Sequence, residues 1–184
     1  MNKFKKIPIN KIQLHSKRLV SAWQYNYFKD TEIKHLDGYF IASNIFSVYV
    51  YSTNKKASVI KEFAIKIDTR ISELIADSRN YINQQQQKLD KKTRIWIDLP
   101  LKMNEPLAIK IDTNKIAPSA LALIKLYIAI DKHIVAAYQA KANGDISTTE
   151  CQIFENKAFK NLNKLLSDIK RISAQFHKIR KENS

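Results

Sequence analysis

The stretch that most constrains the fold runs from Pro118 to Ala142, where apolar residues occupy nearly every face of a predicted helix. Proline suits the first position of a helix, so Pro118 marks its start. A helix that is apolar all round must be covered, either by the rest of its own chain or by a second copy. A membrane span is the rival interpretation, but Lys125, Asp131 and Lys132 fall inside it, and each central charge costs about 2.5 to 3.5 kcal/mol on insertion. We therefore expect a buried helix and no membrane partner.

Two short strands are predicted before this helix. Apolar residues alternate with polar ones over residues 106–113, which is typical of a half-buried strand. Residues 94–101 alternate in the same way, although Pro100 weakens any ladder there. The hexapeptide AIKIDT occurs at residues 64–69 and again at 108–113. Its flanks predict a helix the first time and a strand the second.

Composition favours helices for the rest of the chain. Two glycines and four prolines among 184 residues leave little material for tight hairpins. A hydrophobic content of 45% is enough for a real core. We expect a mainly α protein with a short β-strand, in which a basic arm (1–11) precedes a single mainly helical domain (12–184).

Several further helices are expected in the N-terminal half. Residues 12–28 favour a helix, although Trp23, Tyr25 and Tyr27 alternate as in a strand. These aromatic rings can stack on unpaired bases, but packing in a core is the preferred interpretation. Residues 39–52 are longer than a usual strand, which favours a buried helix. From Val59 onward, apolar residues recur at three and four positions and predict a long amphipathic helix, with a solvated end at 88–92.

A second helix is predicted to follow the apolar one. Asn143 and Gly144 stop the first helix, and Ser147 and Glu150 have the spacing of a capping box that starts the next. Lysine and arginine flank the apolar stripe of this last helix, which consists of Phe154, Ala158, Leu162, Leu165, Ile169, Ile172 and Phe176.

The charge balance favours a polyanionic partner. Thirty-two Lys and Arg stand against seventeen Asp and Glu, which gives a net charge of +15. DNA, RNA, an anionic membrane surface and an acidic protein would all be attracted. The single cysteine, Cys151, excludes a disulfide within the chain and fits a reducing cytoplasm, where we expect the protein to reside.

Catalysis is not indicated by any motif. The chain has no HExxH, no paired-cysteine zinc spacing and no glycine-rich phosphate loop. The four histidines are scattered, and each is more typical of a surface or packing residue than of a ligand or base. A small, partly buried thiol is the preferred interpretation of Cys151. We expect no enzyme activity, no metal, no cofactor and no small-molecule ligand.

From Pro106 onward, the order of features resembles the AcaB-like regulators of conjugative plasmids and integrating conjugative elements. The resemblance is carried by the Pro-Leu strand at 106–111, by the apolar helix with Asp131 and Val135, and by the turn at 144–146 before a basic helix. The family is of the ribbon-helix-helix type. It implies a dimer in which two chains pair one strand each into a ribbon that enters the major groove, with residues 106–176 as the strand-helix-helix core.

On this resemblance, Leu107, Ile109 and Ile111 face inward and the alternating residues face DNA. A solvated strand face is the equally open alternative for Lys110 and Asp112. The strand at 94–101 is the alternative ribbon. The predicted DNA-binding residues are Lys110, Asp112, Thr113 and Lys115, then Arg94 and Lys102, and finally Lys160 and Lys164 on the last helix.

The function expected is therefore that of a dimeric, sequence-specific DNA-binding transcriptional regulator of conjugative transfer genes. The alternative is a scaffold subunit of a conjugation complex that binds nucleic acid without sequence preference. A third possibility, an RNA-binding or ribosome-associated factor, has only the charge in its favour. An obligate homodimer is expected because the apolar surface of residues 119–138 exceeds what one small chain easily covers.

Overall fold

The computed structural model describes residues 11–28, 35–55, 58–93, 105–111 and 116–183. Within these ranges the chain is mainly helical with a small antiparallel sheet, as expected. The elements in order are β1 (Lys11–Leu14), α1 (Lys17–Trp23), the 3-10 helix η1 (Tyr25–Phe28), α2 (Gly38–Ser52), α3 (Val59–Asp90), β2 (Leu107–Lys110), α4 (Pro118–Ala142) and α5 (Thr148–Glu182).

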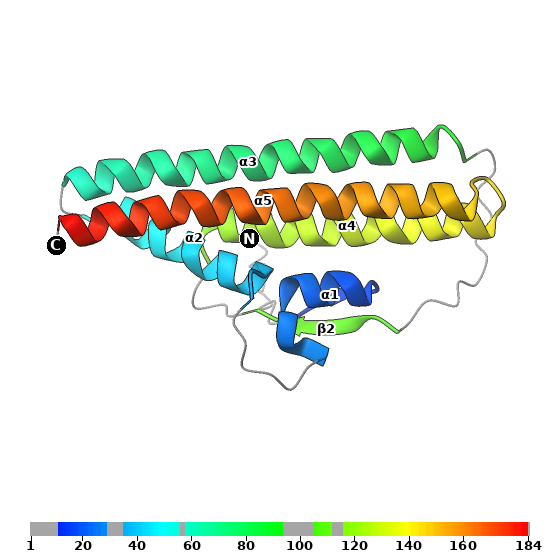
Figure 1. Cartoon of the computed structure of the whole chain (residues 1–184), viewed down its shortest axis with the longest axis horizontal. Coiled ribbons are helices and arrows are strands. Elements are labelled where there is room, and N and C mark those ends of the chain that lie inside the picture. Colours follow the sequence, from blue (N-terminus) through cyan, green and yellow to red (C-terminus); the bar gives the residue numbers. More distant parts are fainter. Residues whose placement is uncertain (1–10, 29–34, 56–57, 94–104, 112–115, 184) are drawn as a thin grey trace, which may run out of the picture.

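Three long helices form the body of the molecule. Figure 1 shows α3, α4 and α5 side by side along the long axis, with α3 and α4 running in one direction and α5 returning. Helix α2 crosses one end of this bundle and packs on all three helices. Helix α1, η1 and the two strands form a smaller layer beneath. The expected helices at 39–52, from Val59 and from 118 onward are confirmed. None of the described helices combines the length and the apolar content that a membrane span requires.

Local signals in the sequence set the helix ends. The Ser147 hydroxyl accepts a hydrogen bond from the Glu150 backbone N–H (3.1 Å), and the Glu150 side chain accepts one from the Ser147 backbone N–H (2.9 Å). The predicted capping box is therefore confirmed. Gly144 follows α4 with φ +79°, a left-handed conformation that glycine adopts without strain.

Helix α4 is covered by its own chain. Its buried residues face α3, α5, α2 and β1, and Leu121, at 38%, is its one exposed large apolar side chain. The premise that this helix needs a second copy to cover it was wrong, because sequence alone does not show how many of the chain's other helices pack around it. The structure thus removes the packing reason for an obligate dimer.

The strand predicted at 106–113 is confirmed over Leu107–Lys110, but its partner differs from the expected one. It pairs antiparallel with β1 of the same chain, with Lys11 opposite Lys110 and Ile12 opposite Ile109. The two-chain ribbon expected for this strand is therefore corrected to a ribbon within one chain. Residues 11–14 were assigned to the basic arm and to a helix start, and this too was wrong. Their alternating exposed and buried pattern has the period of a strand.

The small layer is tied to the bundle by polar and aromatic contacts. The Asp131 carboxylate of α4 accepts hydrogen bonds from the backbone N–H groups of His15 (2.9 Å) and Ser16 (3.1 Å), and pairs with His15 Nδ1 at 2.8 Å. Trp23 packs edge-on against Tyr127 with ring centroids 5.0 Å apart. The core interpretation of Trp23 is therefore confirmed.

Glycine is required where α2 meets this layer. A Cβ atom on Gly38 would lie 2.6 Å from Trp23 Cε3 and 2.7 Å from the Tyr127 hydroxyl oxygen. Both rings are fully or almost fully buried, so neither can move away easily. The absence of a side chain at Gly38 lets the start of α2 approach them closely.

Candidate nucleic-acid interface

Helix α5 presents a continuous basic face to solvent. Its buried face carries the predicted apolar stripe, of which Ile172 alone is half-buried rather than buried. On the other side, no exposed acidic residue occurs between residues 152 and 181. The exposed cations over this span are Lys157, Lys160, Lys164, Lys170, Arg171, Lys178 and Lys181.

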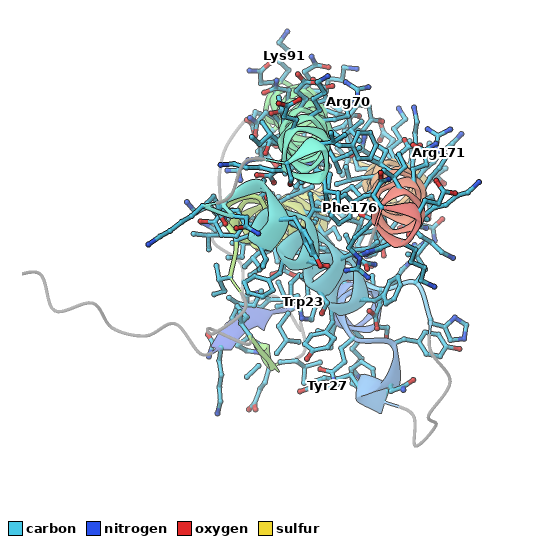
Figure 2. The ribbon with its side chains drawn as sticks, turned by 90° about the vertical axis from the view of Figure 1, so that its left-hand side faces the viewer. Trp23, Tyr27, Arg70, Lys91, Arg171 and Phe176 are labelled. Atoms are coloured by element: carbon cyan, nitrogen blue, oxygen red, sulfur yellow. The ribbon has the colours of Figure 1, made fainter. Side chains whose placement is uncertain are left out.

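Five of these cations lie in one line, which we call the α5 stripe: Lys157, Lys160, Lys164, Arg171 and Lys178. Their spacings of three, four, seven and seven residues return to the same side of a helix with 3.6 residues per turn. That side is opposite the buried stripe. At 1.5 Å per residue, the line is about 32 Å long. Figure 2 shows Arg171 pointing away from the bundle into solvent.

The acidic residues of α5 hardly neutralise this line. Glu155 is half-buried and lies 3.7 Å from Arg18 of α1. Asp168 pairs with Arg171 at 3.1 Å, but the Arg171 side chain remains 73% exposed. An exposed pair of this kind contributes about 0 to 1 kcal/mol and exchanges easily for another anion. In the described part of the chain, the four lysines of the stripe have no carboxylate within 4 Å.

Two of the predicted DNA-binding residues are brought together in this stripe. Lys160 and Lys164 are both exposed on α5, one turn apart. Lys110 ends β2 opposite Lys11, and only its backbone is described. The other predicted residues, Arg94, Lys102, Asp112, Thr113 and Lys115, and the strand predicted at 94–101, lie outside the described residues.

Sequence reasoning missed part of each basic surface. Lys157, Arg171 and Lys178 belong to the stripe, and their angular position on a predicted helix was the signal that could have found them. Lys11 and Gln13 were missed on the ribbon, because their segment was not interpreted as a strand. Both are exposed there, beside the exposed Ala108 of β2, while Ile12 and Leu14 are buried.

The two basic surfaces face different ways. In Figure 2, α5 and Arg171 lie to the right of the bundle axis, whereas the β1–β2 ribbon lies to the lower left. A single straight duplex therefore cannot lie along both surfaces. Each has to be assigned a role of its own.

Two buried titratable side chains, His133 and Cys151, act in packing. Burial lowers the pKa of His133 to about 4, and its Nδ1 contacts Gln86 Oε1 at 2.8 Å, so this histidine packs between helices as expected. Burial raises the pKa of the Cys151 thiol. The preferred interpretation was a small, partly buried thiol, and the structure buries this residue. Among the described residues, no three His, Cys, Asp or Glu side chains cluster as metal ligands would.

Comparison with models of known protein families, with curated proteins and with solved structures finds no significant match.

Proposed function

We propose that this protein binds double-stranded DNA and that the α5 stripe contacts the phosphate backbone. The observation that carries the proposal is the line of five exposed cations, with no exposed acid on the same span of helix. Electrostatic attraction to phosphates supplies most of non-specific DNA binding, and exposed Lys and Arg supply that attraction. We expect a protein with this role to reside in the cytoplasm.

The dimensions of the stripe support this assignment. Its length of about 32 Å is close to one helical turn of B-DNA, which is about 34 Å. The major groove also admits an α-helix. The cations at 157, 160 and 164 are about 4.5 and 6 Å apart along the helix, and the two that follow are each about 10.5 Å further on. Helix α5 can therefore contact several phosphates at once.

Folding gives no reason for the stripe. Like charges four residues apart, such as Lys160 and Lys164, destabilise a helix by about 0.2 to 0.5 kcal/mol. The apolar stripe on the other face already fixes α5 against the bundle. A line of cations that destabilises its own helix is expected where a negatively charged partner binds to it and offsets the repulsion.

The proposal is tested by gel shift with a labelled duplex and unrelated competitor DNA. Replacing Lys160 or Lys164 by Ala should weaken binding to every duplex by a similar factor of about eight at 0.1 M salt, because each lost phosphate contact removes about 0.9 from the salt slope. Lys66→Ala, on the exposed surface of α3, is the matched control. If both sets of variants bind like the parent protein, the stripe is not the contact.

Regulation of conjugative transfer genes, which the resemblance implies, is the finer part of the proposal. Base reading would then fall to the β1–β2 ribbon, since a two-stranded ribbon fits the major groove. Lys11 and Gln13 are exposed on its outer face, and both residue types can hydrogen-bond to base edges. Lys110, opposite Lys11 in the register, remains the residue we expect to read guanine.

The ribbon is tested separately with DNA from upstream of the protein's own operon. Lys110→Ala and Gln13→Ala should each cost roughly 1 to 3 kcal/mol of specific binding and leave binding to random DNA nearly unchanged. If specific and random DNA bind equally well to the parent protein, base reading is excluded. The alternative function, a scaffold subunit that binds DNA without sequence preference, would then hold. It is favoured as the alternative because the stripe lies away from the ribbon, so the stripe can bind DNA without base reading by the ribbon.

A homodimer belongs to the regulatory role, because two-fold operators are read by pairs of subunits. Light scattering of the protein with its operator duplex tests this part. Two copies per duplex support the dimer. One copy per duplex would contradict the dimer, but it would not contradict the contact between the stripe and DNA.

A further inference from the structure

A cleft with a second cluster of lysines lies where α3 finishes and α5 begins. This end of the bundle is at the right in Figure 1. It has a volume of about 460 Å³, which is in the range of small-molecule sites. Its walls include Lys88 from the last turn of α3, Lys91 and Lys92 from the turn that follows, and Lys157 from α5. Lys157 is the one residue that the cleft shares with the α5 stripe.

Most of this charge is uncompensated. Lys92 pairs with Glu150 at 2.5 Å, and hydrogen bonds from Lys92 and Ser147 hold the pKa of Glu150 at about 2. In the part of the chain that the structure describes, no carboxylate lies within 4 Å of the other three lysines. The helix dipole favours cations at the end of α3, but Lys157 comes from the neighbouring helix, about two and a half turns after its start. An anion in the cleft would be bound from both helices.

A buried polar atom in the wall also lacks a partner. Gln85 is 3% exposed, and its Oε1 accepts no hydrogen bond from the described residues. A buried carbonyl oxygen without a donor is costly, so native structures generally supply one. Gln85 lines the cleft, so a small turn of its side-chain amide would bring the oxygen to a bound molecule whose N–H group can provide that donor.

The wall of the cleft on α5 combines the charged Glu150 and Lys157 with two apolar side chains, Ile153 and Phe154. Ile153 is 45% exposed because it lies on the solvent side of α5, in line with the stripe. A large apolar side chain in that position is left in contact with water. Phe154 lies beside it and also lines the cleft. A flat ring system would cover the Ile153 side chain and remove it from water.

We propose that this cleft binds a nucleoside diphosphate, with the phosphates on Lys88, Lys91 and Lys157 and the base between Ile153 and Gln85. The three features require different parts of one ligand: negative charge, an apolar face and an N–H donor. Nucleotides combine all three. The site goes beyond the proposed DNA contact and does not depend on it.

Calorimetric titration of the full chain with ADP, inorganic pyrophosphate and adenosine tests the proposal. We expect ADP to bind at least about tenfold more tightly than pyrophosphate, because only ADP satisfies Gln85 and covers Ile153. Adenosine should bind more weakly than either. Equal affinity for ADP and pyrophosphate would reduce the cleft to a phosphate site and overturn the nucleotide assignment, as would no binding of ADP at millimolar concentration.

Variants separate this site from the DNA contact. Gln85→Leu should lower ADP affinity about tenfold and leave pyrophosphate binding unchanged, because only the base contacts the amide. The double variant Lys88→Ala with Lys91→Ala should abolish binding of both, while its circular dichroism stays that of the parent. Arg171→Ala with Lys178→Ala is the control, which should weaken DNA binding in a gel shift and leave ADP binding intact. If the variants in the cleft bind ADP as the parent does, the assignment is wrong, whatever the result with DNA.

Discussion

Helices α3 and α5 are nearly equal in length, with 32 and 35 residues, and they pack against each other through apolar faces. Their exposed faces differ. On α3, four exposed basic residues are balanced by four exposed acidic ones. On α5, seven exposed basic residues face a single exposed acid, Glu182, at the very end. The same bundle thus tolerates a balanced surface and a basic one.

Polar groups on α3 are used within the fold. Arg70 pairs with Glu73 at 2.9 Å, Arg79 donates to the Lys125 carbonyl at 3.1 Å, and Asp68 accepts from the Ser119 hydroxyl at 2.8 Å. The lysines of the α5 stripe have no such contacts with the described residues. Helix α3 packs in the same bundle without excess positive charge. Folding therefore does not require the stripe on α5, and a binding partner is the better reason for it.

The largest effect on stability should come from the buried face of α5. Phe176 is fully buried and packs on Tyr51 and on Phe63 of α3. Phe176→Ala should cost about 3 to 5 kcal/mol, measured by urea denaturation. The exposed neighbour Gln175→Ala should change stability by less than about 0.5 kcal/mol. A small effect of Phe176→Ala would show that α5 is not fixed by this face.

Acid should weaken the contact between α3 and α4. Gln86 donates its amide to Asp90, so its oxygen faces His133 Nδ1, which must carry the proton. The pKa of His133 is about 4 in the folded protein against 6.5 for the free side chain, so the unfolded chain takes up the proton first. The contribution of His133 to stability is complete above pH 6.5 and is lost as the pH falls toward 4.

The size of this loss is about 3 kcal/mol. Denaturation of the parent protein and of His133→Gln at several pH values measures it as the difference between the two curves. Parallel curves between pH 6.5 and 4 would mean that His133 is not held neutral in the fold.

Matched charge reversals compare the two exposed faces directly. Lys160→Glu with Lys164→Glu on α5 and Lys66→Glu with Arg70→Glu on α3 each change two exposed cations that are four residues apart. The α5 pair should lower DNA affinity roughly a hundredfold at 0.1 M salt, through two lost phosphate contacts and added repulsion. Fluorescence anisotropy measures both. An equal loss for the α3 pair would make net charge, and not the stripe, the cause.

The smallest effect should have opposite signs on the two helices. Lys160→Gln removes a like-charge repulsion with Lys164 and should stabilise the protein by about 0.2 to 0.5 kcal/mol. Arg70→Gln breaks the pair with Glu73 and should destabilise it by a similar amount. Thermal denaturation at low salt measures the change in stability for each variant. If both changes had the same sign, the claim that the stripe destabilises the helix would be wrong.

Periodicity and capping residues predicted most of the fold. Pro118, Gly144 and the Ser147–Glu150 box mark helix ends because their chemistry is local. The repeated hexapeptide shows the limit of that approach. The first copy lies within α3, whereas residues Ala108–Lys110 of the second copy lie in β2. The flanking sequence, and not the hexapeptide, therefore decides which secondary structure forms.

The sequence did not predict which segments distant in the chain pack against each other. Residues 11–14 alternate over only four positions, too few to separate a strand from an extended arm without knowing that β2 lies beside them. The same applies to the cleft, whose lysines come from two helices more than sixty residues apart. For the DNA contact, sequence predicted Lys160 and Lys164. Helical spacing could have added Lys157, Arg171 and Lys178, whereas their exposure and the lack of paired acids on that face required the structure.

The salt dependence of duplex binding tests the central claim most directly. Five cations on phosphates predict a slope of about −4.5 for log K against log salt concentration. In the Lys160→Glu, Lys164→Glu variant the slope should become less steep by about 1.8, and in the Lys66→Glu, Arg70→Glu variant it should not change. A slope near zero in the parent protein, or one that both variants change equally, would contradict DNA binding through the α5 stripe.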